Sequence, residues 1–381
     1  MRKTKIKESK GKTYYIKRKG IPKGCKYCLK GQKAVLFLNG ICQKPDHCAY
    51  YCPISKERRG KDLTFADEIQ ISTKQELLEE IDKINAKGMS ITGGEPLLPG
   101  NIEKTLDFIK YVKAEKGRKF HVHLYTNGLN FTEEIADALE AAGLDELRFH
   151  PPKTQWEKIR LAINKNYSVG AEVPVIPEKE YLETLEKFIL YLDQIGAEFI
   201  NLNEFEICEP NNMALKQRGF HLKKGTVASV EDSQESALEL LKKLAPQVSL
   251  KLHFCTILAK DYYQLKNRYL RRASTIKLPY EIVSEEGLLI YAQIEGKRES
   301  LLKVHELLSS EYQLPPSLLN FDGHLLKLPY DVVLGDEFNT LMNKFKVKAF
   351  IIEMIPFRGR YQQITEKIPL KVFKEEYEEI K

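Results

Sequence analysis

The feature that most constrains the fold is a regular alternation, from Lys33 to Cys255, of short apolar runs with longer stretches of helical periodicity. Alternation of this kind is typical of β/α units built around a parallel sheet. The sequence therefore predicts an α/β fold, a partial parallel (β/α) barrel of six to seven strands. The predicted strands are Ala34–Leu38, Gly88–Thr92, Phe120–Thr126, Asp145–His150, Val169–Val175, Glu198–Phe205 and Ser249–Cys255. The predicted helices are Lys74–Ala86, Ile102–Lys116, Thr132–Ala142, Thr154–Asn164, Glu178–Ile195 and Glu231–Leu244.

After about Ala273 the rhythm changes. Apparent hairpins surround Ser284–Gly287 and Phe321–Gly323, each is followed by a helical stretch, and a final strand lies near Ala349–Ile355. We therefore expect three parts: a basic N-terminal arm with a C-x2-C pair over residues 1–29, the barrel over residues 30–275, and a small α+β domain over residues 276–381.

Composition and charge narrow the class of protein. No apolar run approaches the roughly 18 residues that a membrane helix needs, and the chain starts with charged residues, so we expect a cytoplasmic protein without a membrane partner. The seven cysteines are an odd number. In a reducing compartment, clustered cysteines are better explained as metal ligands or reactive thiols than as disulfides.

Three cysteines follow the first predicted barrel strand. Cys42, Cys48 and Cys52 fall in one short loop, the cysteine loop, at the end of a strand where the functional residues of such folds gather. Thiolates at this spacing can converge on a soft metal or on an iron–sulfur cluster. Three protein ligands to a four-iron cluster leave one iron open, and a catalytic cluster needs such a position.

The next two strands also end in distinctive turns. Gly93-Gly94-Glu95-Pro96 closes the second strand, where paired glycines let a ligand approach the backbone and the carboxylate can accept hydrogen bonds from an amine. Thr126-Asn127-Gly128 closes the third strand. Either turn alone is weak support. Their order after the cysteine loop indicates one site at the ends of three successive strands.

In these three features the sequence resembles the radical S-adenosylmethionine (radical SAM) superfamily. Cys52-Pro-Ile-Ser and His121-Val-His123-Leu-Tyr125 resemble its mainly archaeal branch related to pyruvate formate-lyase activating enzymes. The resemblance covers roughly residues 24 to 275. The cysteine loop departs from the usual C-x3-C-x2-C spacing, because it reads C-x5-C-x3-C. The resemblance implies a [4Fe-4S] cluster on Cys42, Cys48 and Cys52, and S-adenosylmethionine (SAM) beside Tyr51, Gly93, Gly94, Glu95, Thr126 and Asn127.

The implied activity is a one-electron reduction of bound SAM that releases methionine and a 5′-deoxyadenosyl radical, which takes a hydrogen atom from the substrate. Substrate residues should then lie on the later strands, and the leading catalytic candidates are Glu172, Asn203 and Glu204. Polar residues on both faces of a buried strand are unusual unless one face lines a cavity. The alternative is a hydrogen-bonded structural network at the barrel end. Further candidates on these strands are Arg148, His150, Asn201 and Glu206.

Two smaller features leave alternatives open. Cys25 and Cys28 form a C-x2-C pair that fits a second metal site, zinc or an auxiliary cluster. Cys208 and Cys255 could complete that site or could be small buried apolar residues. The stretch Lys56–Asp62 could hold an anionic group such as a substrate phosphate, although such runs are more often solvated turns.

The expected partners follow from the same interpretation. A small molecule or cofactor precursor is the main substrate hypothesis, and a low-potential donor such as ferredoxin or flavodoxin would supply the electron. Two variants are the modification of an RNA base, which the basic N-terminal residues favour, and the activation of a glycyl-radical enzyme. A hypothesis of another class is a zinc-stabilised nucleic-acid-binding protein, which explains the cysteines but not the glycine turn.

Overall fold

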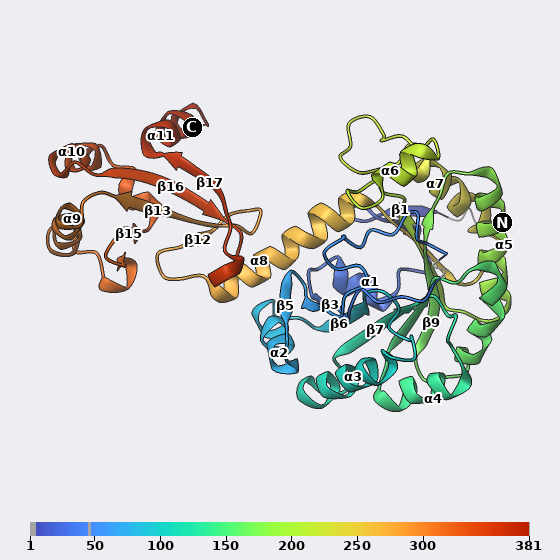
Figure 1. The fold of residues 1–381 in the computed structure, drawn as a ribbon. Helices are drawn as coiled ribbons and strands as arrows, with labels where there is room; N and C mark the ends of the chain where they lie inside the picture. Colours follow the sequence, from blue (N-terminus) through green and yellow to red (C-terminus); the bar gives the residue numbers. More distant parts are fainter. Residues whose placement is uncertain (1–4, 45–46, 381) are drawn as a thin grey trace. The chain divides into compact units, whose positions relative to one another are not determined.

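The computed structural model describes residues 5–44 and 47–380, with residues 377–380 described by their backbone only. The chain divides into two compact units, Met1–Leu265 and Lys266–Lys381 (Figure 1). Within the described residues, no helix combines the length and the apolar character that crossing a bilayer requires.

The first unit is built on an eleven-stranded sheet whose middle strands are parallel. The parallel strands are β3 Lys33–Phe37, β6 Gly88–Thr92, β7 His121–Thr126, β8 Glu146–Phe149, β9 Ser168–Val175, β10 Phe199–Glu204 and β11 Lys251–Cys255. They lie side by side in chain order, so each β/α unit adds its strand next to the previous one. The strand order does not return to its start. The predicted partial parallel barrel is confirmed.

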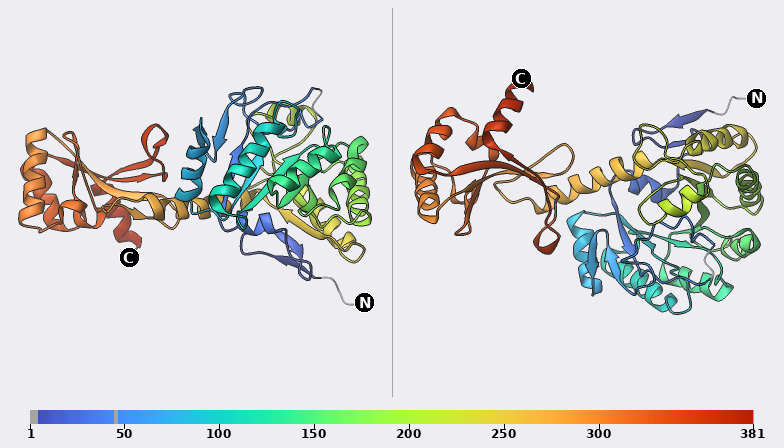
Figure 2. Two further views of the ribbon diagram at one scale, coloured as in Figure 1. Left: turned by 90° about the horizontal axis from the view of Figure 1, so that it is seen from below. Right: turned by 45° about the horizontal axis from the view of Figure 1, so that its top comes forward.

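Helices cover the outer face of this sheet (Figures 1 and 2). A short helix, α6 (Asn212–Gln217), instead buries Leu215 in a separate small cluster. The covering helices are α2 Lys74–Lys83, α3 Ile102–Lys116, α4 Glu133–Ala142, α5 Lys179–Gln194 and α7 Ser233–Leu244. Apolar side chains of these helices and of the strands share one large core. Because side chains alternate along a strand, the other residues of each strand point into the barrel. The segment Lys153–Ala162 forms a 3-10 helix instead of the predicted α-helix, and it buries only Ile159 and Ala162.

Short antiparallel strands extend the sheet at both ends. β1 (Ile6–Glu8) pairs with β2 (Tyr14–Ile16), and β2 pairs with β11. Residues that were expected in a basic arm are therefore part of the sheet. At the other end, β4 (Thr64–Ala66) pairs with β3 and with β5 (Ile69–Ile71).

The C-x2-C pair lies on α1 (Lys23–Cys28), which contacts β3, β6 and β7. A Cβ on Gly24 would lie within 2.7 Å of side-chain atoms of Arg148, His123 and Glu146. The Gly24 amide donates a hydrogen bond to Glu146 Oε2 at 3.0 Å, at the start of β8. The short helix α1 therefore packs against the inward side chains near the N-terminal ends of the strands.

The second unit is an α+β domain with a six-stranded sheet in the order β14, β15, β13, β16 and β17, with β12 paired to β13. Its elements are α8 Leu265–Ile276, β12 Ile282–Val283, β13 Leu289–Glu295, α9 Arg298–Ser310, β14 Asn320–Phe321, β15 Leu325–Leu328, α10 Asp336–Phe345, β16 Lys348–Met354, β17 Ile364–Pro369 and α11 Leu370–Ile380. The neighbouring strands are antiparallel, and both predicted hairpins are present. Leu301 and Val304 of α9 and Phe338 of α10 bury one face of the sheet. The sequence analysis missed β17, whose side chains are mostly exposed.

Candidate active site

A cavity of about 690 Å³ lies at the C-terminal ends of the parallel strands. Its volume falls in the range of small-molecule and cofactor sites. All the expected cluster ligands, SAM-binding residues and leading catalytic candidates line this cavity, and so do His150 and Glu206, whereas Arg148 and Asn201 do not. The ligands, SAM-binding residues and leading candidates are Cys42, Cys48, Tyr51, Cys52, Gly93, Gly94, Glu95, Thr126, Asn127, Glu172, Asn203 and Glu204.

The glycine turn after β6 is held against the segment that leads into the cysteine loop. The Gly94 amide donates to Asn39 O at 2.7 Å, and the Glu95 amide donates to Ile41 O at 2.9 Å. A Cβ on Gly94 would lie 2.0 Å from Ile41 O. Gly93 has a φ of +139°, a region that favours glycine. The glycines therefore allow close packing of two loops, and this packing fixes the start of the cysteine loop.

We expect Gly94→Ala to displace the start of the cysteine loop, because the added methyl group overlaps Ile41 O. Both the melting temperature of the iron-free protein and the iron content after reconstitution should fall. The matched control is Gly100→Ala in the same connection, where an added Cβ meets nothing within 4 Å. Equal melting temperatures and iron contents for the two variants would contradict the packing role of Gly94.

The Glu95 carboxylate joins the turns that follow β6 and β7. Its oxygens accept hydrogen bonds from Thr126 Oγ1 at 2.7 Å, from the Asn127 amide at 2.8 Å and from the Leu97 amide at 2.9 Å. Burial raises the pKa of this carboxyl, and the three hydrogen bonds oppose the rise. An amine was the expected donor to this carboxylate. In the structure, its hydrogen bonds to described residues hold the two turns together.

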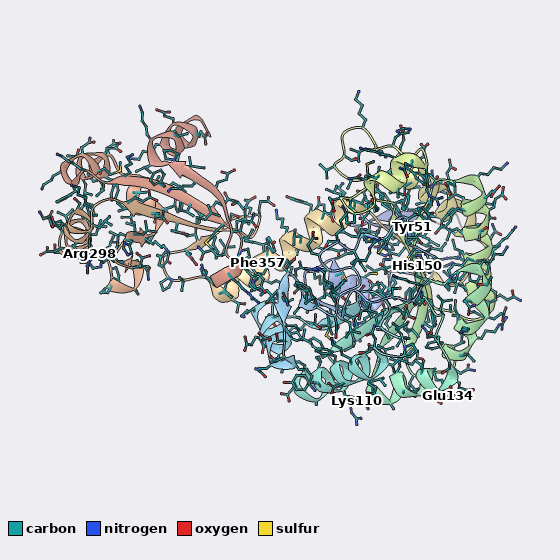
Figure 3. The ribbon with its side chains drawn as sticks, viewed as in Figure 1. Tyr51, Lys110, Glu134, His150, Arg298 and Phe357 are labelled. Carbon is teal, nitrogen blue, oxygen red and sulfur yellow. The ribbon has the colours of Figure 1, made fainter. Side chains whose placement is uncertain are left out.

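The cysteine loop is tied to its surroundings near its last cysteine. Tyr51 Oη and His150 Nε2 are 2.9 Å apart, so the residue that follows β8 contacts the loop (Figure 3). Asn211 Nδ2 donates to Tyr51 O at 3.1 Å, and Arg59 Nη2 donates to Cys52 O at 2.9 Å. Residues 45–46 of the loop lie outside the described residues.

Glu172 on β9 presents a carboxylate to the cavity in a fixed orientation. It accepts hydrogen bonds from Arg148 Nη1, from Asn203 Nδ2 at 3.0 Å and from Tyr125 Oη at 3.4 Å. Its side chain retains 13% exposure, whereas that of Arg148 retains 2%. Glu172 and Asn203, two of the predicted catalytic residues, are thus hydrogen-bonded to each other at the cavity lining.

Glu204 and Glu206 have different partners, although alternation places them on the same face of the chain. Glu204 Oε2 accepts a hydrogen bond from the Ile257 amide at 2.8 Å and is buried, so it holds the connection after β11. Glu206 pairs with Lys260 at 3.2 Å, and both line the cavity. Lys260 belongs to a π-helix, η2 (Ala259–Gln264), a rare form that is frequent at functional sites.

A buried ion network lies beneath the cavity, among the inward side chains. Arg148 is 1% exposed and contacts the carboxylates of both Glu146 and Glu172. Burial alone would raise the pKa of Glu146, but the Arg148 guanidinium and a hydrogen bond from His121 hold it well below its ordinary value. Arg148 Nη2 also lies 3.4 Å from Cys25 Sγ. The cation that orients Glu172 is therefore itself positioned by β8 and α1.

We expect the first unit to lose stability as the pH falls below about 6.5, the ordinary pKa of histidine. Burial lowers the pKa of His253 to about 3, and the burial of His123 acts in the same direction. Between about pH 3 and about pH 6.5 these histidines bind protons in the unfolded chain but not in the folded chain, so acid favours unfolding. Urea unfolding at about pH 7 and about pH 5 measures the loss. The loss of unfolding free energy should be smaller in His253→Gln. An unchanged loss in that variant would contradict the assignment of the acid sensitivity to His253.

Residues 19–193 match the family model of the radical SAM superfamily. A Methanocaldococcus jannaschii protein that carries the provisional name glycyl-radical enzyme activating enzyme is 35% identical over 368 residues, which cover 92% of this chain and 93% of the relative. This chain belongs to the radical SAM superfamily.

Other known proteins match shorter parts of the chain. GTP 3′,8-cyclase of Aquifex aeolicus is 30% identical over 120 residues, which cover 31% of this chain and 36% of the relative. Among solved structures, SuiB of Streptococcus suis bound to S-adenosylmethionine has a TM-score of 0.40 at 10% identity, covering 59% of this chain and 50% of SuiB. A likeness this distant carries no further argument.

Membership in the radical SAM superfamily makes the chain an enzyme and implies SAM and a [4Fe-4S] cluster as cofactors. The resemblance recognised from the cysteine loop and the glycine turn is therefore confirmed. The residues on the cavity lining fit these groups, because three cysteines from one loop offer the soft thiolate donors of such a cluster. Within the described part of the chain, no three His, Cys, Asp or Glu side chains are already gathered as a metal-binding group.

The other cysteines do not line the cavity of this radical SAM enzyme. Cys25 and Cys28 lie on α1, Cys208 follows β10, and Cys255 ends β11. Burial raises the pKa of all four thiols, and that of Cys255 rises to about 12. A second metal on Cys25 and Cys28 stays a prediction.

Sequence reasoning left Tyr125 without a role, whereas Arg58 and Arg59 belong to the stretch Lys56–Asp62 that was expected to hold an anionic group or to form a solvated turn. Tyr125 donates to Glu172, and Arg58 and Arg59 line the cavity beside the cysteine loop. The signal for Tyr125 was present, because His121, His123 and Tyr125 alternate along β7 and all point inward. No period marks Arg58 and Arg59, which lie in a turn.

Proposed function

We propose that this radical SAM enzyme reductively cleaves SAM at a [4Fe-4S] cluster, producing a 5′-deoxyadenosyl radical that abstracts hydrogen from a substrate bound in the same cavity. The observation that carries the proposal is the shared lining. The cysteine loop, the turns after β6 and β7, and the polar side chains of β9 and β10 all border one space. A cofactor bound by the cysteine loop and the two turns would therefore be in contact with a substrate bound by the side chains of β9 and β10.

In this proposal Cys42, Cys48 and Cys52 would hold the cluster. The packing of Gly94 on Ile41 O anchors one end of the cysteine loop, and the Tyr51–His150 contact anchors the other. Tyr51, Gly93, Gly94, Glu95, Thr126 and Asn127 form the proposed surface for SAM. Glu95 acts through the turns that it joins.

The substrate side of the proposed site is the polar wall of β9 and β10. Glu172 can accept a hydrogen bond from the substrate, and Asn203 can both donate and accept one. Arg148 and Tyr125 orient the Glu172 carboxylate, so a substrate group bound there would be held in one position. Glu204 supports this wall through the Ile257 backbone.

The main substrate hypothesis is a small molecule or a cofactor precursor, for which a cavity of about 690 Å³ is suitable. A second candidate is the activation of a glycyl-radical enzyme, favoured by the provisional name of the full-length M. jannaschii relative. In that case the substrate would be a protein segment. In either case a low-potential donor such as ferredoxin or flavodoxin would supply the electron.

The test is anaerobic reconstitution with iron and sulfide, followed by reduction in the presence of SAM and assay of 5′-deoxyadenosine. We expect a brown protein that forms 5′-deoxyadenosine only with both SAM and reductant. A protein that binds iron, binds SAM and yet releases no 5′-deoxyadenosine would sink the proposal. Addition of candidate glycyl-radical enzymes, with detection of a glycyl radical by electron paramagnetic resonance, separates the two substrate hypotheses.

A further inference from the structure

Arg58 is a half-buried cation on the cavity lining. Its guanidinium carbon lies 3.7 Å from the centre of the Phe65 ring and 5.3 Å from that of Phe37. The Arg58 side chain makes no hydrogen bond and no ion pair with any residue that the structure describes. Burial lowers the pKa of Arg58, and the charge of Glu68 acts in the opposite direction without forming an ion pair. The protein therefore places this cation without neutralising it.

The Arg58 guanidinium lies over a pair of aromatic rings. Phe37 of β3 and Phe65 of β4 are partners in the antiparallel pair, and their rings meet edge to face at 6.1 Å. A ring holds a guanidinium by its flat face. The five N–H donors lie in the plane of the guanidinium, and their fork matches a carboxylate or a phosphate.

The turn that carries Arg58 is fixed against the end of β3. The Gly60 amide donates to Gly40 O, and the Gly40 amide donates to Lys61 O, both at 2.8 Å. A Cβ on Gly40 would lie 1.8 Å from Arg58 O, so only glycine allows this approach. The neighbouring Arg59 also lines the cavity and uses Nη2 to donate to Cys52 O. Two adjacent guanidinium groups are thus presented by a rigid turn.

We propose that Arg58 and Arg59 form an oxyanion site that binds a phosphate or carboxylate group of the substrate. The inference rests on the proposed function, in which the surface for SAM is formed by other residues of the cavity, so these arginines remain available to a second molecule. It narrows the substrate to a small molecule with a compact anionic group. Charge-assisted, bidentate hydrogen bonds to arginine are the strong ones, and they fix orientation as well as affinity.

The test is calorimetric titration of inorganic phosphate into the reconstituted holoenzyme saturated with SAM. We expect the parent to bind phosphate and Arg58→Gln to bind it roughly tenfold or more weakly, from the loss of charge-assisted hydrogen bonds. Arg58→Lys keeps the charge but loses the fork, so it should also bind weakly. The matched control is Lys56→Gln, which removes a charge from an exposed position in the same turn outside the cavity lining. The phosphate affinity of Lys56→Gln should equal that of the parent.

Two results would overturn the proposal. One is equal phosphate affinity in the parent, in both Arg58 variants and in Lys56→Gln. The other is loss of SAM affinity in Arg58→Gln together with no phosphate binding to the SAM-saturated parent, which would assign the arginines to the carboxylate of SAM. The 5′-deoxyadenosine assay on the same preparations tests the proposed function separately, because phosphate binding does not require SAM cleavage.

Discussion

Arg148→Met should destabilise the first unit by about 3–5 kcal/mol, because it leaves two carboxylates without their shared cation in the barrel interior. Arg148 is 1% exposed and bridges Glu146 and Glu172, and Glu146 is equally buried. The methionine fills most of the volume of the arginine side chain, so the lost stability comes from the missing charge and not from a cavity. Chemical denaturation of the cluster-free protein at neutral pH measures this change in the free energy of unfolding.

Two further variants make the stability test specific. Arg160 forms an exposed i,i+3 pair with Glu157, and Arg160→Met should leave the unfolding midpoint nearly unchanged. Neutralising both carboxylates, in Glu146→Gln/Arg148→Met/Glu172→Gln, should recover part of the loss because no unpaired charge remains buried. An Arg148→Met midpoint equal to that of Arg160→Met would contradict the proposed importance of the network.

Replacing any one of Cys42, Cys48 and Cys52 with alanine should abolish stable cluster assembly and with it 5′-deoxyadenosine formation. Each substitution removes one of three thiolates, and a four-iron cluster held by two protein ligands is not retained. Iron and sulfide content, visible absorbance and product formation after anaerobic reconstitution check the outcome.

Cys208→Ala is the matched control for the cysteine series. Cys208 lies near enough to Cys52 for their charges to interact, yet it does not line the cavity. We expect this variant to keep the cluster and the activity of the parent. If Cys208→Ala lost the cluster while Cys42→Ala kept it, the assignment of the ligand loop would be wrong.

The parallel part of the fold could be predicted because burial on both faces leaves a strong signal. β6 and α3 were predicted to their exact bounds, and β7, β9 and β10 within a residue or two. The shared location of the site residues followed from the same reasoning, since parallel strands end at one edge of the sheet. Three distant turns therefore had to meet, and all of them line one cavity.

Short edge elements and side-chain partners could not be predicted in this way. β1, β2, β4 and β5 have three residues each, too few for a period, and they exist because a neighbouring strand is present to pair with them. Alternation also cannot tell what a carboxylate will bind. Glu204 contacts a backbone amide, whereas Glu172 contacts Arg148 and the cavity, and only the tertiary structure separates the two cases.

The positions of β1, β2 and α1 have a consequence for the order in which the first unit folds. β2 can pair with β1 alone but can join the sheet only after β11 exists, and Thr256 Oγ1 donates to Lys12 O across a separation of 244 residues. The Gly24 amide likewise finds Glu146 122 residues later. Contacts this distant in sequence form late, because the intervening loop must close first. The segment from β1 to α1, which precedes the barrel in the sequence, therefore joins it after nearly all the barrel has formed, and it completes the sheet and the ion network last.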